Sequence, residues 1–305
     1  MTGQKTNIIV NPNADRGSAW RMVSNLRPLV EEFGGAEWSG SVYPTHATLL
    51  ARQAAEAGSQ LVIAAGGDGT VHEVINGLMQ VPREMRPRLG IIPLGSGNDF
   101  AHTIGIHTNP AEALKQIYTG RPTPIDLGLF DTGDGRGEYF DNTFGLGFDA
   151  TVTVRTQRLT RLKGFMMYLV AVLQTIALNH EAPMMHIVTD TESWNEETIM
   201  LAICNGPREG GGFLVAPGSA ISDGVLNYAA VTHVSRLMML RLIPEVMKGT
   251  HGRFRQVKLG QLHKLDVRAD KPVTIHADGE VIAGFGTRVQ HVTVEVVPSA
   301  LELMI

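Results

Sequence analysis

The chain has 305 residues, of which 43% are hydrophobic and 18% are charged. This length is typical of about two domains, and the composition is that of a globular protein, which excludes disordered, collagen-like and polar repeat proteins. The 26 basic and 30 acidic residues give a formal net charge of −4. Because a protein that neutralises a phosphate backbone needs excess positive charge, we expect no nucleic acid as a partner.

Two features concern the cellular compartment. The single cysteine, Cys204, cannot form an intramolecular disulfide, and the first residues lack the charged region and apolar stretch of an export signal. The longest apolar run, Phe165–Leu178, is interrupted by Gln174 and Thr175 and is shorter than the roughly 20 residues that cross a bilayer. We therefore expect a cytoplasmic protein with no transmembrane segment.

The first hundred residues alternate short β-branched runs with amphipathic stretches, which is the pattern of strands and crossover helices in a parallel sheet. Strands are predicted at Thr6–Val10, Leu61–Ala65 and Leu89–Pro93. Helices are predicted at Ala19–Phe33, at Thr45–Ala57, and from Val71 onward, where apolar residues recur at helical spacing. The first part of the chain is therefore predicted to be an α/β domain.

After about Asp126 the pattern changes to period-two runs bounded by Gly, Asp, Asn and Pro, which predicts mostly antiparallel β structure. Two amphipathic stretches, Arg158–Leu178 and Ser235–Met247, are predicted to be helices that cover the sheet. The predicted strands are Glu138–Asn142, Met184–Thr189, Thr198–Cys204, Val225–Thr232, Gln256–Leu259, Lys264–Arg268, Val273–Ala277 and Val292–Val297.

Two glycine-rich loops join predicted strands to helices. Residues 66–70 read Gly-Gly-Asp-Gly-Thr, and residues 95–99 read Gly-Ser-Gly-Asn-Asp. Both loops should open at the carboxyl edge of a parallel sheet, where ligands of open α/β sheets bind. Glycines let a phosphate approach the backbone, and Asp68 would repel that phosphate unless a cation lay between them. The loops predict a metal–phosphate site, with helix capping by Asp68 as the alternative.

Other known nucleotide and metal motifs are absent from the sequence. There is no Walker loop, and no dinucleotide-binding glycine pattern follows the first strand. His72-Glu73 begins like a zinc-protease helix, but Asn76 stands where the second histidine would be required.

The motifs together resemble the diacylglycerol kinase catalytic family, and in particular the soluble bacterial lipid kinases. The resemblance begins with Asn11-Pro12, the two glycine loops, and Glu73 to Gly77. It continues in the second half with Phe144 to Ala150, with Pro217 and Ser222 to Leu226, and with Asp278-Gly279-Glu280. Nearly the whole chain is covered.

The resemblance implies an α/β ATP-binding domain at residues 1–126, to which residues 298–305 return. It also implies a β-sandwich-like lipid-substrate domain at residues 127–297, with the active site in the cleft between the domains. The expected activity is ATP- and Mg²⁺-dependent transfer of the γ-phosphate to a lipid hydroxyl. Diacylglycerol, giving phosphatidic acid, is the first expectation, while another glycerolipid and a sphingoid base stay open.

Site residues follow from the resemblance position by position. ATP would be bound by residues of the three strand–helix junctions and by one threonine: Asn11, Pro12, Asn13, Ala14, Asp15, Thr45, Gly66, Gly67, Asp68, Gly69, Thr70, Val71, His72, Glu73, Ser96, Asn98 and Asp99. Whether Arg16 and Lys163 reach a phosphate is left open.

The resemblance also implies which carboxylates bind metal ions and which one accepts the proton of the acceptor hydroxyl. Asp223, with the carbonyls of Ala220 and Val225, is expected to hold a structural Mg²⁺. The candidates for a catalytic Mg²⁺ are Asp68, Asp99 and Asp126, because Mg²⁺ keeps several waters and needs few protein carboxylates. Glu280 is expected to be the catalytic base that takes the proton of the acceptor hydroxyl, with Asp278 as the alternative.

Two other functions fit parts of the sequence. NAD kinase also carries a Gly-Gly-Asp-Gly-Thr loop, and a nucleotide-binding regulatory module without turnover would keep the same glycine loops. A lipid substrate implies transient contact with the inner membrane surface, and a homodimer is left open. The apolar stretch Phe165–Leu178 and the strip Phe213 to Val215 would either form a groove for an acyl chain or belong to the core.

Overall fold

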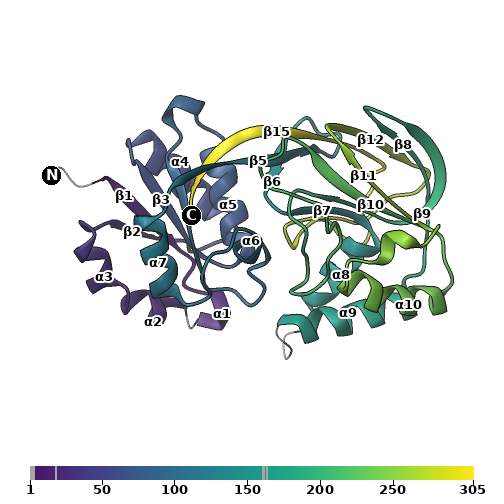
Figure 1. Cartoon of the computed structure of the whole chain (residues 1–305), viewed down its shortest axis with the longest axis horizontal. Helices are drawn as coiled ribbons and strands as arrows, with labels where there is room; N and C mark the ends of the chain where they lie inside the picture. The colour runs from purple at the N-terminus through teal and green to yellow at the C-terminus, as the bar shows by residue number, and fades with distance from the viewer. Residues whose placement is uncertain (1–3, 18, 160–161, 163) are drawn as a thin grey trace. The chain divides into compact units, whose positions relative to one another are not determined.

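The computed structural model describes residues 4–17, 19–159, 162 and 164–305, without the side chains of Asp15 and Arg16. The chain divides into two compact units (Figure 1). One unit contains the residues up to Ile125 together with Ser299–Ile305, and the other contains Asp126–Pro298. Each unit is described by itself below.

The first unit is built on a parallel sheet in the order β4-β3-β1-β2, with the end of β15 beside β4. Every residue of β1 and β3 is buried, as expected for central strands covered on both faces. At the edge, Leu303 of β15 pairs in parallel with Leu89. The strands are β1 (Thr6–Val10), β2 (Glu37–Gly40), β3 (Leu61–Gly66), β4 (Arg88–Pro93) and, shared with the second unit, β15 (His291–Met304).

Short helices connect these strands. They are α1 (Ala14–Gly17), α2 (Ala19–Ser24), α3 (Arg27–Glu32), α4 (His46–Glu56), α5 (Asp68–Leu78), α6 (Asp99–Thr103) and α7 (Pro110–Thr119), with a 3₁₀ turn η1 (Arg83–Met85). The single helix predicted for Ala19–Phe33 was wrong, because two helices, α2 and α3, occupy that stretch. Pro28 lies in the first turn of α3, where a residue without an N–H can begin a helix but could not continue one.

The second unit is predominantly antiparallel. One run of strands has the order β14-β13-β7-β9, with β10 and β11 continuing from β9, and the other contains β8, β12 and β15 with β5 and β6. The strands are β5 (Pro122–Asp131), β6 (Glu138–Phe140), β7 (Thr143–Gly147), β8 (Met184–Thr189), β9 (Ser193–Cys204), β10 (Leu226–Thr232), β11 (Val257–Leu262), β12 (Lys264–Ala269), β13 (Ile275–Ala277) and β14 (Glu280–Ala283). Phe130, Phe140 and Phe144 pack together in the core between them.

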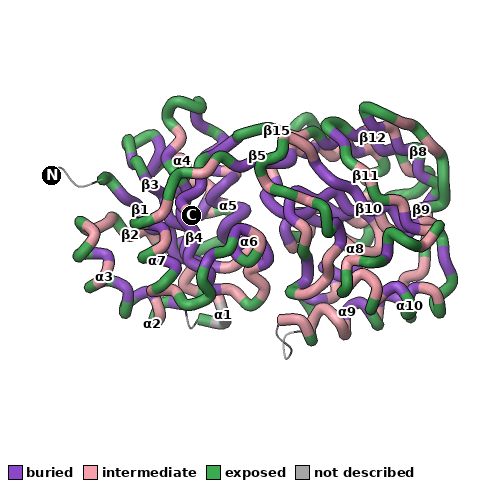
Figure 2. The backbone as a smooth tube through the Cα atoms, in the orientation of Figure 1, coloured by how far each residue is buried: buried purple, intermediate pink, exposed green. Residues whose placement is uncertain are grey.

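Three helices lie together along one side of the second unit (Figure 1). They are α8 (Phe148–Thr156), α9 (Gly164–Leu178) and α10 (Arg236–Met247), and a 3₁₀ turn η2 (His251–Arg253) follows α10. Pink and green stretches along α9 and α10 mark residues that are only partly buried or exposed (Figure 2). Among the residues that the structure describes, no helix combines the length and apolar character needed to span a membrane.

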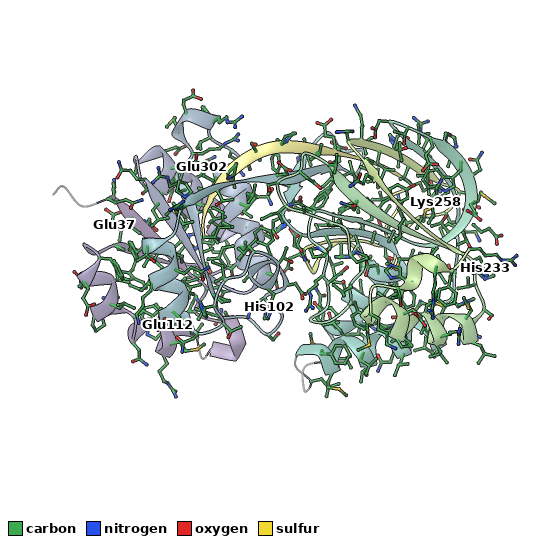
Figure 3. All side chains as sticks on the ribbon, in the orientation of Figure 1. Glu37, His102, Glu112, His233, Lys258 and Glu302 are labelled. Carbon is green, nitrogen blue, oxygen red and sulfur yellow. The ribbon has the colours of Figure 1, made fainter. Side chains whose placement is uncertain are left out.

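The two units confirm the predicted fold class, a parallel α/β unit followed by a mostly antiparallel β unit. The sequence pattern missed several elements, among them β2, β5, β7, β14, α7 and α8, and the strand predicted for Glu138–Asn142 ends earlier, at Phe140. Charged side chains such as Glu37 and Glu112 are exposed at the surface, as Figure 3 shows.

Candidate active site

The two glycine loops of the first unit touch each other. Gly67 precedes α5, and Gly95 lies in the loop between β4 and α6. A Cβ atom on Gly95 would lie 2.5 Å from the Cα atom of Gly67, closer than atoms of two side-chain-bearing residues could approach. The backbone contact therefore requires glycine at Gly95, and it holds the two loops side by side at the carboxyl ends of β3 and β4.

Asp68 connects these loops through its carboxylate. Its Oδ2 atom accepts the backbone N–H of Asn98 at 2.8 Å, and its Oδ1 atom accepts that of Phe100 at 3.4 Å. Asn98 adopts a left-handed conformation, and its side chain bonds both the N–H and the carbonyl of Gly95 at 2.9 Å. Asp68 thus begins α5 and at the same time satisfies amides at the start of α6.

The segment after β1 and the start of α4 are hydrogen-bonded to side chains of α5. Asn11, after β1, donates from Nδ2 to Thr70 Oγ1 at 3.2 Å. The Glu73 carboxylate accepts the N–H of Thr45 at 2.9 Å and that of Ala47 at 3.0 Å, which satisfies the start of α4. The fold therefore brings the segments after β1 and β3 and the start of α4 together around the first turns of α5.

Exposure separates the predicted nucleotide-binding residues into two groups. Ser96, Asn13 and Thr45 are exposed, and Gly67, Asp68 and Gly69 are half-buried, so these can meet a ligand directly. The side chains of several others are buried: Thr70, Val71, His72 and Asp99. The side chains of Asp15 and Arg16 and the whole of Lys163 lie outside the described residues, so their predicted roles stay predictions.

The Asp278-Gly279-Glu280 motif forms the hairpin between β13 and β14 in the second unit. Asp278 and Gly279 have positive φ angles of 49° and 82°, the conformation of a two-residue hairpin turn. The buried Asp278 carboxylate accepts three backbone N–H groups: those of Asp141 at 3.0 Å, Asn142 at 2.9 Å and Thr143 at 3.0 Å. Asp278 therefore fixes the hairpin, and the same bonds turn the backbone after β6.

Glu280 differs from Asp278 in exposure. It is the first residue of β14, and it is exposed. A general base must come within hydrogen-bond reach of the proton that it takes, which an exposed carboxylate on a fixed hairpin can do. This geometry favours Glu280 over Asp278 as the group that contacts an acceptor hydroxyl.

The predicted structural metal site lies on a loop that Asp126 holds. Asp126 is buried, and its Oδ2 atom accepts the N–H of Gly224 at 2.7 Å, while its own N–H donates to Ile221 at 2.7 Å. Asp223 is exposed and accepts the N–H of Val225 at 3.3 Å. Asp126 lies in the second unit, whereas the other two candidates for a catalytic Mg²⁺, Asp68 and Asp99, lie in the first.

His276, on β13 just before the hairpin, belongs to a buried ionic cluster that the sequence analysis missed. His276 Nε2 is 3.1 Å from Asp149 Oδ2 and 3.2 Å from Glu209 Oε1, and the three side chains are the only His, Asp, Glu or Cys group of the described residues gathered tightly enough to hold a metal ion. Burial opposes protonation of His276, but the charges of Glu209 and Asp149 outweigh it and raise the pKa of the imidazole to about 9.

One glycine of the Phe144 to Ala150 motif makes room for this cluster. A Cβ atom on Gly145 would lie 2.3 Å from His276 Nε2 and 2.4 Å from Asp149 Oδ2. Gly145 also pairs with His276 across β7 and β13. The motif was recognised in the sequence, but the reason for its glycine appears only when the two strands are paired.

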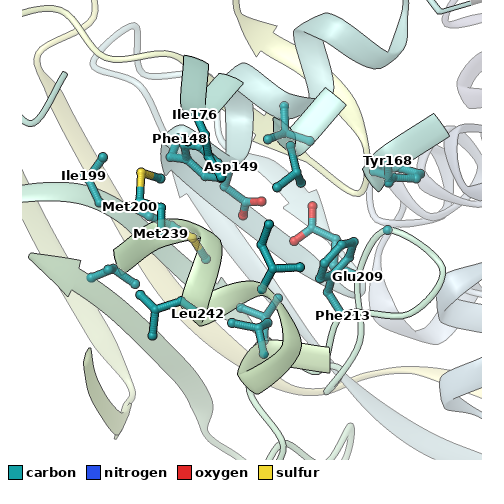
Figure 4. Close-up of a pocket in the computed structure, with 17 residues that line it drawn as sticks. Phe148, Asp149, Tyr168, Ile176, Ile199, Met200, Glu209, Phe213, Met239 and Leu242 are labelled. Carbon is teal, nitrogen blue, oxygen red and sulfur yellow. The ribbon is translucent and has the colours of Figure 1, made fainter. Parts of the chain in front are cut away.

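Asp149 and Glu209 also line an apolar cavity of about 100 Å³ in the second unit (Figure 4). Its other walls come mainly from α8, α9, α10 and β9: Phe148, Val152, Tyr168, Val172, Ile176, Ile199, Met200, Gly210, Phe213, Val215, Val231, Met239, Leu242, Ile243 and Val246. The predicted acyl-groove segments, Phe165–Leu178 and Phe213 to Val215, both contribute to this lining. Their inner side chains therefore surround a mostly apolar cavity with two carboxylates in its wall.

Comparison with known proteins identifies the family. The sequence pattern of the "Diacylglycerol kinase catalytic domain" matches residues 5–130, and that of the "YegS C-terminal NAD kinase beta sandwich-like domain" matches residues 142–305. The chain belongs to this family of kinases. A "Probable lipid kinase YegS-like" from Chromohalobacter salexigens is 36% identical over 76% of this chain and 73% of its own length. A relative of the same name from Yersinia pestis is 31% identical over 82% and 80%.

Solved structures show the same two-unit fold. One structure from Bacillus anthracis superposes with a TM-score of 0.81 at 25% identity and covers 100% of this chain and 96% of that chain. Another from the same organism, described as a diacylglycerol kinase, gives a TM-score of 0.73 at 22% identity over 100% and 97%. The family resemblance expected from the sequence is confirmed.

Proposed function

We propose that this kinase uses ATP and Mg²⁺ to phosphorylate the hydroxyl group of a lipid, with diacylglycerol as the first acceptor to test. The observation that carries this proposal is the apolar cavity with Asp149 and Glu209 in its wall, in the same unit as the exposed Glu280. An apolar cavity with a few polar groups suits a molecule that has a hydrocarbon chain and a polar head. The relatives named as lipid kinases support the same class of acceptor.

The donor site of the proposal is the pair of glycine loops in the first unit. Amides at the start of a helix favour an anion, and glycines allow phosphates to approach the backbone. The half-buried Gly67 and Gly69 and the exposed Ser96 supply such groups at the carboxyl ends of the strands, whereas Thr45, whose N–H is bonded to Glu73, would contribute its hydroxyl. We assign the nucleotide phosphates to this edge, and we retain residues 11–15 as a further wall of the same site.

Mg²⁺ suits the carboxylate and carbonyl oxygens of these sites. Asp68 and Asp99 would hold a catalytic ion through water, and Asp223 with the carbonyls of Ala220 and Val225 would hold a structural one. When bound, the catalytic ion would neutralise charge that develops on the transferred phosphoryl group. Asp126 orders the loop of the structural site through its bond to Gly224, so we propose a positioning role for Asp126.

Glu280 is proposed as the base of the transfer. Its carboxylate takes the proton of the acceptor hydroxyl while that oxygen forms a bond to the γ-phosphorus, and the bond from phosphorus to the bridging oxygen of ADP breaks. Asp278 keeps the hairpin in place through its three amide bonds. Their different exposure supports catalysis by Glu280 and positioning by Asp278.

We place a hydrocarbon chain of the acceptor in the apolar cavity. Asp149 and Glu209 are then the groups that can accept hydrogen bonds from hydroxyls at the head of the lipid, because the remaining cavity walls are almost entirely apolar. Their charges are balanced in part by His276. A cytoplasmic location with transient access to a membrane belongs to this proposal.

A transfer screen tests the function. Purified full-length protein is incubated with radiolabelled ATP and Mg²⁺ and with diacylglycerol, monoacylglycerol, sphingosine or NAD as acceptor. We expect label in a lipid product. Label in NADP instead would establish an NAD kinase, and neither transfer nor ATP hydrolysis above background would leave a nucleotide-binding module.

A cavity-filling variant tests where the chain binds. Ile243→Trp should raise KM for a long-chain acceptor about tenfold or more, because the ring occupies space that the chain needs, while KM for ATP stays unchanged. Leu259→Trp is the matched control, since Leu259 is an exposed side chain outside the cavity. Equal lipid KM values for both variants would contradict the placement of the chain.

A further inference from the structure

The outward face of α10 has an unusual composition. The exposed residues of this fully described helix follow one stripe and are only apolar, proline or basic: Arg236, Leu237, Leu240, Arg241, Pro244 and Met247, with the exposed Lys248 directly after them. Leu237 is 79% exposed and Leu240 is 43% exposed. A surface helix normally turns polar residues of both charges outward and apolar residues inward. Here apolar residues occupy both faces, since Met239 and Leu242 are buried on the inner one.

The neighbouring helix α9 adds to this face. Its sequence contains no charged residue, and Met166, Leu173 and Leu178 are 54%, 43% and 67% exposed. Arg236 on α10 donates from Nε to the carbonyl of Ile176 at 3.0 Å, which joins the two helices. Single exposed leucines are normal on a protein surface, but several on two joined helices mark an interaction site. We call the outward residues of α9 and α10 the α9–α10 face.

The exposed charges of α10 and of the segment that follows it are basic. Besides Arg236 and Arg241 on α10, the following segment exposes Lys248, Arg253 and Arg255. Glu245 is the acidic residue of α10, and it is half-buried and paired with Arg253. The whole chain has a formal net charge of −4, so this basic excess is local. It complements a negatively charged surface.

The same two helices line the apolar cavity with their inner faces. Val172 and Ile176 of α9 and Met239 and Leu242 of α10 belong to its wall. The outward apolar stripe and the cavity are therefore two sides of one helix pair. A lipid that leaves a bilayer at the outer face of these helices would therefore find the apolar cavity on their inner face.

We propose that the α9–α10 face docks on the surface of an anionic phospholipid bilayer. Leu237, Leu240 and Leu173 enter the boundary between headgroups and acyl chains, while Arg241 and Lys248 contact anionic headgroups. The inference rests on the proposed function, because a membrane that holds the acceptor is the natural partner of a lipid kinase. It adds the surface through which the membrane is reached.

Vesicle flotation without ATP and without any acceptor lipid tests docking by itself. We expect the full-length protein to float with phosphatidylcholine vesicles that contain phosphatidylglycerol, and to float less with phosphatidylcholine alone or at high salt. A Leu237→Asp/Leu240→Asp double variant should weaken binding at least about tenfold. Each of Arg241→Gln and Lys248→Gln should weaken binding to the anionic vesicles roughly fivefold. Met85→Asp is the control, because Met85 is a comparably exposed apolar residue in the first unit.

Two further measurements separate this inference from the proposed function. With an acceptor dissolved in detergent, the Leu237→Asp/Leu240→Asp variant should keep wild-type turnover, because the substitutions weaken only its binding to a bilayer. Floating wild-type protein that phosphorylates no lipid would refute the proposed function and leave the docking surface standing. A wild-type enzyme that phosphorylates lipid but does not float would overturn the inference. So would a leucine variant that floats normally but changes a dimer into a monomer in sedimentation, since the face would then join two copies of the chain.

Discussion

The two carboxylates of the β13–β14 hairpin should respond to substitution in opposite ways. In Asp278→Asn, one acceptor oxygen becomes an NH₂ group, which cannot accept the backbone N–H that faced it. The three N–H groups now bound at 2.9–3.0 Å then cannot all be satisfied. A buried donor left without its partner costs about 1–3 kcal/mol, and more where the lost acceptor was charged. We expect the free energy of unfolding to fall by roughly 2–4 kcal/mol.

Glu280→Gln changes an exposed side chain of similar shape. The free energy of unfolding should stay within about 0.5 kcal/mol of the wild type. Loss of the base should lower kcat by about 10²–10⁴-fold with little change in the KM for ATP. Denaturant unfolding and steady-state transfer with saturating lipid, measured on both variants, provide the comparison.

Two results would refute this reasoning. Turnover near the wild-type value in Glu280→Gln would remove its role as base. Unfolding of Asp278→Asn at wild-type denaturant concentrations would show that the three amide bonds do not hold the hairpin. If that variant also lost turnover while Glu280→Gln kept it, Asp278 would be the base.

Three other predictions concern the second unit. Asp223→Ala should abolish the rise in melting temperature that Mg²⁺ gives the wild type, because an ion bound only to the folded state stabilises it; an undiminished rise would exclude the proposed site. The pKa of His276 is raised from 6.5 to about 9, so its contribution of up to roughly 3 kcal/mol should be complete below pH 6.5 and be lost as the pH rises through about 9. Urea unfolding of wild type and His276→Gln across that range checks this, and identical pH profiles would contradict it. Gly145→Ala should destabilise the protein by roughly 1–3 kcal/mol, since its Cβ would lie 2.3 Å from His276 Nε2; a calorimetric melting temperature equal to that of the wild type would argue against the required space.

Local sequence patterns were sufficient to predict the elements that consist of an unbroken run of mostly apolar residues. The buried β-branched run Thr6–Val10 is a strand with the predicted bounds, because a central parallel strand needs apolar residues on both faces. Strand β7 was missed, because Gly145 and Gly147 lower its strand propensity. Gly145 is needed for a contact with β13, which lies 130 residues further along the chain, and no local pattern encodes that contact.

The amino-acid sequence by itself determined the family, the two kinds of fold, and the glycine loops and carboxylates expected at the site. These depend on residue type and short spacing, which a linear chain displays directly. Only the tertiary structure decided that Asp278 is buried and bonded while Glu280 is exposed, and that His276 meets Asp149 and Glu209. It also decided which faces of α9 and α10 line a cavity and which face outward. Those properties depend on contacts between segments distant in sequence, and such contacts form only when the strands and helices pack together.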